Sequence, residues 1–128
     1  MASNAQYVAT PKNGVAQATV ANTARDGTGT LATVYTAGAS GARIDSLIVH
    51  ATGTTTAGMI RFFVSNGSAT VLIKELPVQA VTPSATIPAW SNEVQFPNGL
   101  ILQATWTLKA ATNNTETFNI IPIIAGDF

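Results

Sequence analysis

Clusters of Gly, Asn, Pro, Ser and Thr interrupt the sequence roughly every ten residues, and this spacing constrains the fold most. The runs between the clusters are rich in Val, Ile and Thr, whose branched Cβ atoms favour extended backbone. Such a rhythm is typical of an all-β sandwich or barrel rather than of helices. It predicts eight strands, at residues 14–20, 31–36, 43–51, 59–65, 69–76, within 85–96, 100–108 and 117–125.

Asn66-Gly67 gives the clearest local signal, because both positions of a two-residue hairpin turn need positive φ. Pairing outward from this turn predicts that Val64 lies beside Ala69, Phe62 beside Val71 and Ile60 beside Ile73. Phe63 and Leu72 then fall on the opposite face of the hairpin.

Two later segments predict more of the sandwich. Residues 100–108 alternate apolar and polar side chains, which places Trp106 on the dry face of a strand that follows a Pro97-Asn98-Gly99 turn. Residues 117–125 are apolar on both faces. Pro122 has no N–H to donate, so we expect this strand to lie at an edge or to contain a bulge.

The length of 128 residues fits one domain. We expect an extended N-terminal arm at residues 1–13 and an antiparallel β-sandwich at residues 14–128. Eight strands joined by loops of uneven length favour a jelly roll. A sandwich of the immunoglobulin type, with seven or nine strands, is the competing prediction.

Charge and composition argue for contacts with other proteins. Charged residues make up 9% of the chain, and six basic residues balance six acidic ones without forming a basic cluster. Nucleic-acid binding needs several Lys or Arg side chains on one face, so we do not expect it. The apolar runs are too short to cross a membrane, and the N-terminus lacks the pattern of a secretory signal. A surface this poor in charge suits a protein that packs against copies of itself or against partners, although its many polar residues could equally keep it soluble.

No pattern in the sequence predicts catalysis. His50 is the single histidine, and in a regular strand the odd offset to Asp45 places the two side chains on opposite faces. The six carboxylates are spread along the chain, and a zinc site would need several clustered ligands. We therefore predict no enzyme activity, no catalytic or metal-binding residues, no cofactor and no small-molecule substrate.

Some apolar side chains are candidates for a protein-contact surface because they fall outside the predicted core. They could also lie under loops. Trp90, in an irregular stretch after Pro88, could anchor a partner or close one end of the sandwich. These candidates are Phe63, Leu72, Trp90, Ile121 and Ile123.

Several segments together resemble small structural proteins of tailed bacteriophages, of the capsid decoration or cement type. They are Gly14-Val15-Ala16-Gln17, the turn-rich residues 21–30, residues 41–47, residues 51–61 and Glu116-Thr117-Phe118-Asn119. The resemblance covers most of the chain.

The resemblance implies a module on the outside of a virion head that binds the major capsid protein and copies of itself, as a dimer or trimer. The protein would be made in the cytoplasm of the bacterial host. The arm, with Tyr7 and Val8, would act as a strap that becomes ordered on binding. The alternative function is a glycan- or receptor-binding module of a head fibre or tail, suggested by Trp90 and the uneven loops.

Overall fold

The structure, a computed structural model, describes residues 8–128. Every regular element in this range is a β-strand, so the predicted all-β class is confirmed. The strands are β1 (Thr10–Pro11), β2 (Ala16–Ala18), β3 (Ala32–Thr36), β4 (Ala42–Ala51), β5 (Gly58–Ser65), β6 (Thr70–Val78), β7 (Ser91–Leu102), β8 (Thr107–Thr112) and β9 (Phe118–Asp127).

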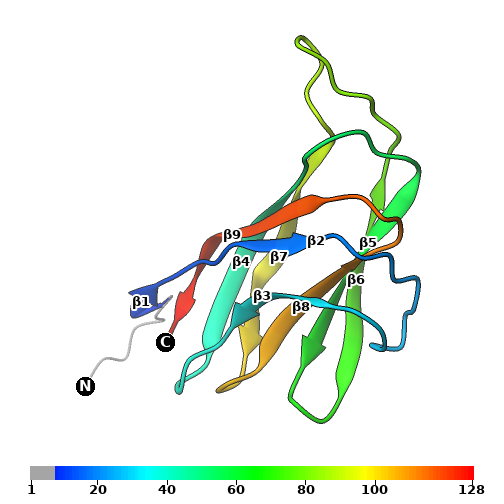
Figure 1. The fold of residues 1–128 in the computed structure, drawn as a ribbon. Coiled ribbons are helices and arrows are strands. Elements are labelled where there is room, and N and C mark those ends of the chain that lie inside the picture. Colours follow the sequence, from blue (N-terminus) through cyan, green and yellow to red (C-terminus); the bar gives the residue numbers. More distant parts are fainter. Residues whose placement is uncertain (1–7) are drawn as a thin grey trace.

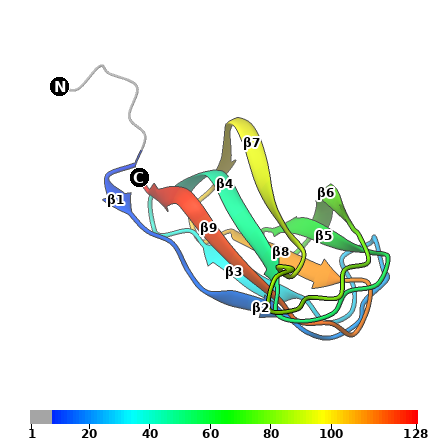
Figure 2. The same ribbon diagram turned by 90° about the horizontal axis from the view of Figure 1, so that it is seen from above.

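These strands form two antiparallel sheets packed face to face (Figures 1 and 2). In sheet A, β1 and β2 both pair with β9, which is followed by β4 and β7. Sheet B has the order β3-β8-β5-β6. The antiparallel pairs β5–β6, β4–β7, β3–β8 and β2–β9 are nested along the chain and alternate between the sheets. The chain is therefore one long hairpin rolled into a jelly roll, which is not the strand order of an immunoglobulin sandwich.

The core lies between the two sheets. It takes alternate side chains from each strand, because successive side chains of a strand point to opposite faces. Trp90 closes one end of this core, with its ring edge-to-face against Phe118 at a centroid distance of 5.8 Å. The largest fully buried core side chains are Phe62, Phe118, Ile44, Leu47, Ile60, Leu102, Leu108, Ile120, Val49 and Val94.

The predicted register of the β5–β6 hairpin is wrong. Ser65 pairs with Thr70, so the connection has four residues, 66–69, rather than two. The side-chain oxygen of Asn66 accepts hydrogen bonds from the backbone N–H groups of Ser68 (2.9 Å) and Ala69 (2.7 Å), which stabilises the longer turn. A bulge at Ile73 then shifts the pairing, and Ile60 faces Leu76 instead of Ile73.

The boundary between β7 and β8 also differs from the prediction. Pro97-Asn98-Gly99 is not a turn between strands but part of a bulge inside β7, where residues 96–99 face Asp45 between the pairs Ile44–Leu100 and Ser46–Gln95. Asn98 (φ 67°) and Gly99 (φ 84°) adopt left-handed backbone, which the bulge requires. Consequently the true turn lies at residues 103–106, and Trp106 is half-buried there rather than inside a strand.

Pro122 lies at a bulge in β9, as one of the two predicted possibilities had it. The pairing with β4 shifts between Ser46–Ile124 and Leu47–Pro122, and on its other side β9 pairs with β2 up to Ile120 and with β1 from Gly126. Pro122 thus falls in the gap between β1 and β2, where no ladder hydrogen bond is needed from its nitrogen.

Candidate protein-contact surfaces

The residues predicted to form a contact surface do not lie together. Tyr7 is outside the described residues. Phe63 is fully buried and Trp90 is 7% exposed, so the expectation that these two side chains lie on a surface is wrong. Val8, Leu72 and Ile121 are half-buried and Ile123 is 43% exposed, so these four remain accessible.

Phe63 is buried because the β2–β3 loop, residues 19–31, covers the outer face of sheet B. Asn22 N–H donates to the carbonyl of Thr112 in β8 (2.8 Å), and Arg25 Nε donates to Glu75 Oε2 in β6 (2.7 Å). Since β5 lies between β8 and β6, a loop bonded to both strands must cross β5. Loop cover, the alternative to a contact surface, is therefore what the structure shows for Phe63.

A buried arginine stabilises this covered face. Arg61 in β5 is 4% exposed, and its guanidinium donates to Glu75 Oε2 (3.0 Å) and to Asn113 Oδ1 (3.1 Å). The hydrogen bond from Arg25, together with that from Arg61, holds the pKa of Glu75 below its usual value despite partial desolvation. One carboxylate thus joins the loop to the sheet beneath it.

The outer face of sheet A is open by contrast. Four isoleucines, which we call the isoleucine face, lie on it: Ile48, Ile101, Ile121 and Ile124. Ile48 pairs with Ile121 across β4 and β9, Ile101 pairs with Arg43, and Ile124 lines a small hollow with Arg43 and Asp45. Ile48, Ile101 and Ile124 are 37%, 52% and 57% exposed.

Sequence reasoning identified Ile121 and missed the other three members of the isoleucine face. The available signal was the apolar character of both faces of β9, together with Ile101 standing in an otherwise polar row. Ile123, the other predicted residue of this strand, lines a hollow with Pro11, Lys12 and Asn13 near β1 instead.

The described part of the predicted arm is bound to the sandwich by an ion pair. Lys12 Nζ donates to Asp127 Oδ2 (2.8 Å) and to the carbonyl of Thr36 (2.9 Å), and it lies 4.8 Å from the centre of the Tyr35 ring. Burial raises the pKa of Asp127, but hydrogen bonds from Lys12, Tyr35 and the Gly38 N–H outweigh burial and leave this pKa below its usual value. Burial raises the pKa of Tyr35 above its usual value, and the hydrogen bond that its hydroxyl donates to the Asp127 carboxylate raises it further.

The β6–β7 connection, residues 79–90, extends beyond the end of the sandwich (Figure 1). We call it the projecting loop. Thr55 holds its first leg, since Thr55 Oγ1 donates to the carbonyl of Gln79 (2.7 Å) and the backbones of Thr55 and Val81 form a two-way bridge. Trp90 holds its second leg, with its carbonyl accepting from Ala51 N–H (2.8 Å).

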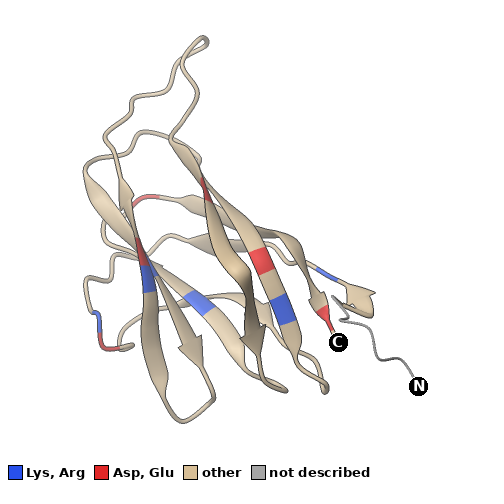
Figure 3. Ribbon diagram, turned by 180° about the vertical axis from the view of Figure 1, so that it is seen from behind, with Lys and Arg blue, Asp and Glu red and all other residues tan. Residues whose placement is uncertain are grey.

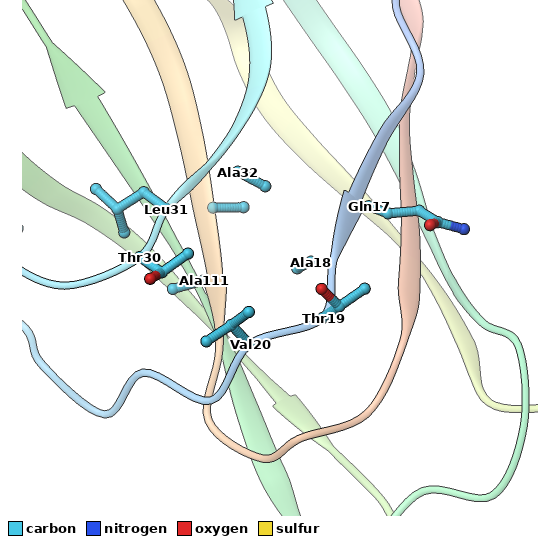
Figure 4. Close-up of a pocket in the computed structure, with 9 residues that line it drawn as sticks. Gln17, Ala18, Thr19, Val20, Thr30, Leu31, Ala32 and Ala111 are labelled. Carbon is cyan, nitrogen blue, oxygen red and sulfur yellow. The ribbon is translucent and has the colours of Figure 1, made fainter.

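The cavity between β2 and sheet B offers no reactive chemistry. Its volume is about 190 Å³, and its lining comes from β2, from the two ends of the β2–β3 loop, from the start of β3 and from β8 (Figure 4). None of the lining residues is titratable. They are Gln17, Ala18, Thr19, Val20, Thr30, Leu31, Ala32, Ala110 and Ala111.

His50 lies exposed on the outer face of sheet A, paired with Ser91 and Asn119. The prediction that Asp45 points to the opposite face is wrong, because the bulge after Ile44 shifts the alternation and both side chains face outward. Five residues of strand, roughly 16 Å, still separate the two positions. The Asp45 carboxylate bonds instead to Arg43 Nε at 2.7 Å.

Within residues 8–128, no group of three or more His, Asp or Glu side chains is arranged to hold a metal ion. No helix capable of spanning a membrane occurs in the same range. Charged positions are scattered singly or in small groups over both sheets, as Figure 3 shows.

Comparison with known proteins gives no relative: no family model matches the chain, and no curated protein matches it.

Proposed function

We propose that this chain is a virion structural protein, a capsid decoration or cement module that binds the outer surface of a tailed-phage head. It stabilises the head through contacts with the major capsid protein and with copies of itself. It acts from the exterior of the particle and performs no chemical reaction.

The observation that carries this proposal is the open isoleucine face. One outer face of the jelly roll is covered by the chain's own loop, whereas the other presents Ile48, Ile101, Ile121 and Ile124 beside the charged side chains of Arg43, Asp45 and Glu93. Exposed aliphatic patches on a soluble protein mark sites of contact with other proteins. A rigid jelly roll loses little conformational entropy on binding. A larger part of the interaction energy of each contact therefore remains as binding free energy.

The test uses particles of the phage that encodes the chain. Quantitative mass spectrometry should find the protein in a fixed ratio to the major capsid protein. Particles from a deletion mutant should release their DNA at a lower temperature, and adding the purified protein should restore the wild-type value. A protein absent from washed particles, or one whose deletion leaves DNA release unchanged, would end the proposal.

The glycan-binding alternative loses the residue that suggested it. Sugar recognition by stacking needs an accessible aromatic ring, and Trp90 is packed against Phe118 in the core. We therefore propose no second function.

A further inference from the structure

The projecting loop lies within the longest segment of the sequence that contains no charged residue. From Leu76 to Asn92 no Lys, Arg, Asp or Glu occurs, and Figure 3 shows the whole projection without a charged position. Its tip nevertheless exposes a large aliphatic side chain: Ile87 is 51% exposed. An uncharged projection with an exposed isoleucine at its end suits insertion into an apolar site.

The tip is built to hold one conformation. Ser84 Oγ accepts hydrogen bonds from the N–H groups of Thr86 (3.3 Å) and Ile87 (3.1 Å), and Ser84 N–H donates to the carbonyl of Ile87 (2.9 Å). Pro83 and Pro88 flank this turn and fix φ on each side of it.

Both legs of the loop are anchored as well, by Thr55 on one side and Trp90 on the other. Thr55 is 2% exposed and Trp90 7%, so neither anchor depends on a mobile surface group. A loop that is ordered before binding loses little conformational entropy on contact, which raises the affinity that one buried side chain can supply.

The chemistry of the tip distinguishes among partners. A membrane surface attracts basic residues, and residues 76–92 contain none. Stacking against a glycan needs an accessible aromatic ring, and Trp90, the one aromatic residue among residues 76–92, is buried. The exposed aliphatic side chain of Ile87 on an uncharged loop fits an apolar, uncharged recess on another protein.

We infer that Ile87 inserts into an apolar recess on the major capsid protein and that the projecting loop is the element that docks the module on the shell. This inference rests on the proposed function and assigns its shell contact to the loop. The isoleucine face is then left for neighbouring copies of the chain.

The test is co-sedimentation of the full-length chain with shells purified from the deletion mutant, titrated to give a half-saturation concentration. Ile87→Asp should raise this concentration at least roughly tenfold, because a carboxylate cannot enter an apolar recess without losing its hydration. Val20→Asp is the matched control, since Val20 is also a β-branched side chain with 51% exposure. Its effect should stay below about twofold.

A second measurement covers the case in which Ile87→Asp fails to fold, as circular dichroism would report. A photo-cross-linking residue at position 87 should join the chain to the major capsid protein, and the same residue at position 20 should not. If wild type binds the shells while Ile87→Asp binds equally well, or if position 87 does not cross-link to the shell, the loop assignment is overturned and the proposed function stands. If wild type itself does not bind, both are overturned.

Discussion

The outer faces of the two sheets both carry apolar side chains, but one face is covered by a loop and the other is exposed to solvent. On sheet B, Phe63 and Arg61 lie beneath the β2–β3 loop and are almost entirely buried. On sheet A, Ile48 and Ile124 have no such cover and are 37% and 57% exposed. An apolar outer face is therefore not in itself a contact surface, because the chain can cover it.

The covering loop has its own structural requirements, which the open face lacks. Asn22 organises it, donating from Nδ2 to the carbonyls of Thr28 (2.9 Å) and Thr30 (3.0 Å) and accepting from Ala24 N–H. Gly27 has φ 85°, and a Cβ at this position would lie 2.5 Å from the carbonyl oxygen of Thr70 in β6. Asn22 thus fixes the conformation of the loop, and Gly27 allows the loop to approach β6 closely.

Truncation of one apolar side chain on each face gives the largest expected difference. Phe63→Ala should lower the free energy of unfolding by about 3–5 kcal/mol, because it leaves a cavity under the loop. Ile124→Ala, its counterpart on the open face, should change it by about 0.5 kcal/mol or less. Urea denaturation measures both values, and equal losses would show that the two faces do not differ in cover.

Removing the organiser of the loop should make sheet B resemble sheet A. Asn22→Ala should reduce the free energy of unfolding by about 1 kcal/mol, because the half-buried hydrogen bonds from Asn22 to the carbonyls of Thr28 and Thr30 are lost. The Arg25 side chain is already exposed, but a loosened loop should let the backbone around it enter the active site of trypsin, so cleavage after Arg25 should become faster than in wild type. Gln17→Ala, which removes a hydrogen bond at the exposed edge of sheet A, is the control and should leave that cleavage unchanged.

The contrast between the faces also explains what the sequence could predict. Eight spaced apolar segments predicted the all-β sandwich, but the choice between a jelly roll and an immunoglobulin-type order needed the structure, because the order of segments along the chain does not determine which strands pair. Asn66-Gly67 correctly marked a turn. The register failed where bulges occur, at Ile73 and at residues 96–99, because a bulge shifts which side chains face inward and the sequence there was read as regular strand or as a turn.

The contact residues were harder to predict for a different reason. Whether Phe63 is exposed depends on a loop that begins more than thirty residues earlier in the chain and crosses β5 only in the folded protein. Trp90 stands in an irregular stretch of the sequence, yet its ring packs against Phe118, which is also far from it along the chain. Long-range packing of this kind cannot be deduced from periodicity.

The smallest predicted effect concerns how acid changes the covered face. Hydrogen bonds from Arg25 and Arg61 hold the pKa of Glu75 below its usual value, so ionised Glu75 binds its partners better in the folded state than in the unfolded chain. Its contribution to stability is present above the unfolded pKa, about 4.3, and disappears as the pH falls through the folded value. Wild type should therefore unfold at a higher urea concentration than Glu75→Gln at pH 6, and the difference should shrink below about pH 4.

Glu93→Gln, on the outer face of sheet A, is the matched control: Glu93 forms no ion pair with a residue in the described range, so this substitution should shift the midpoint little at either pH. A Glu75→Gln difference that persists unchanged at low pH would mean that the carboxylate's charge does not hold the loop on sheet B.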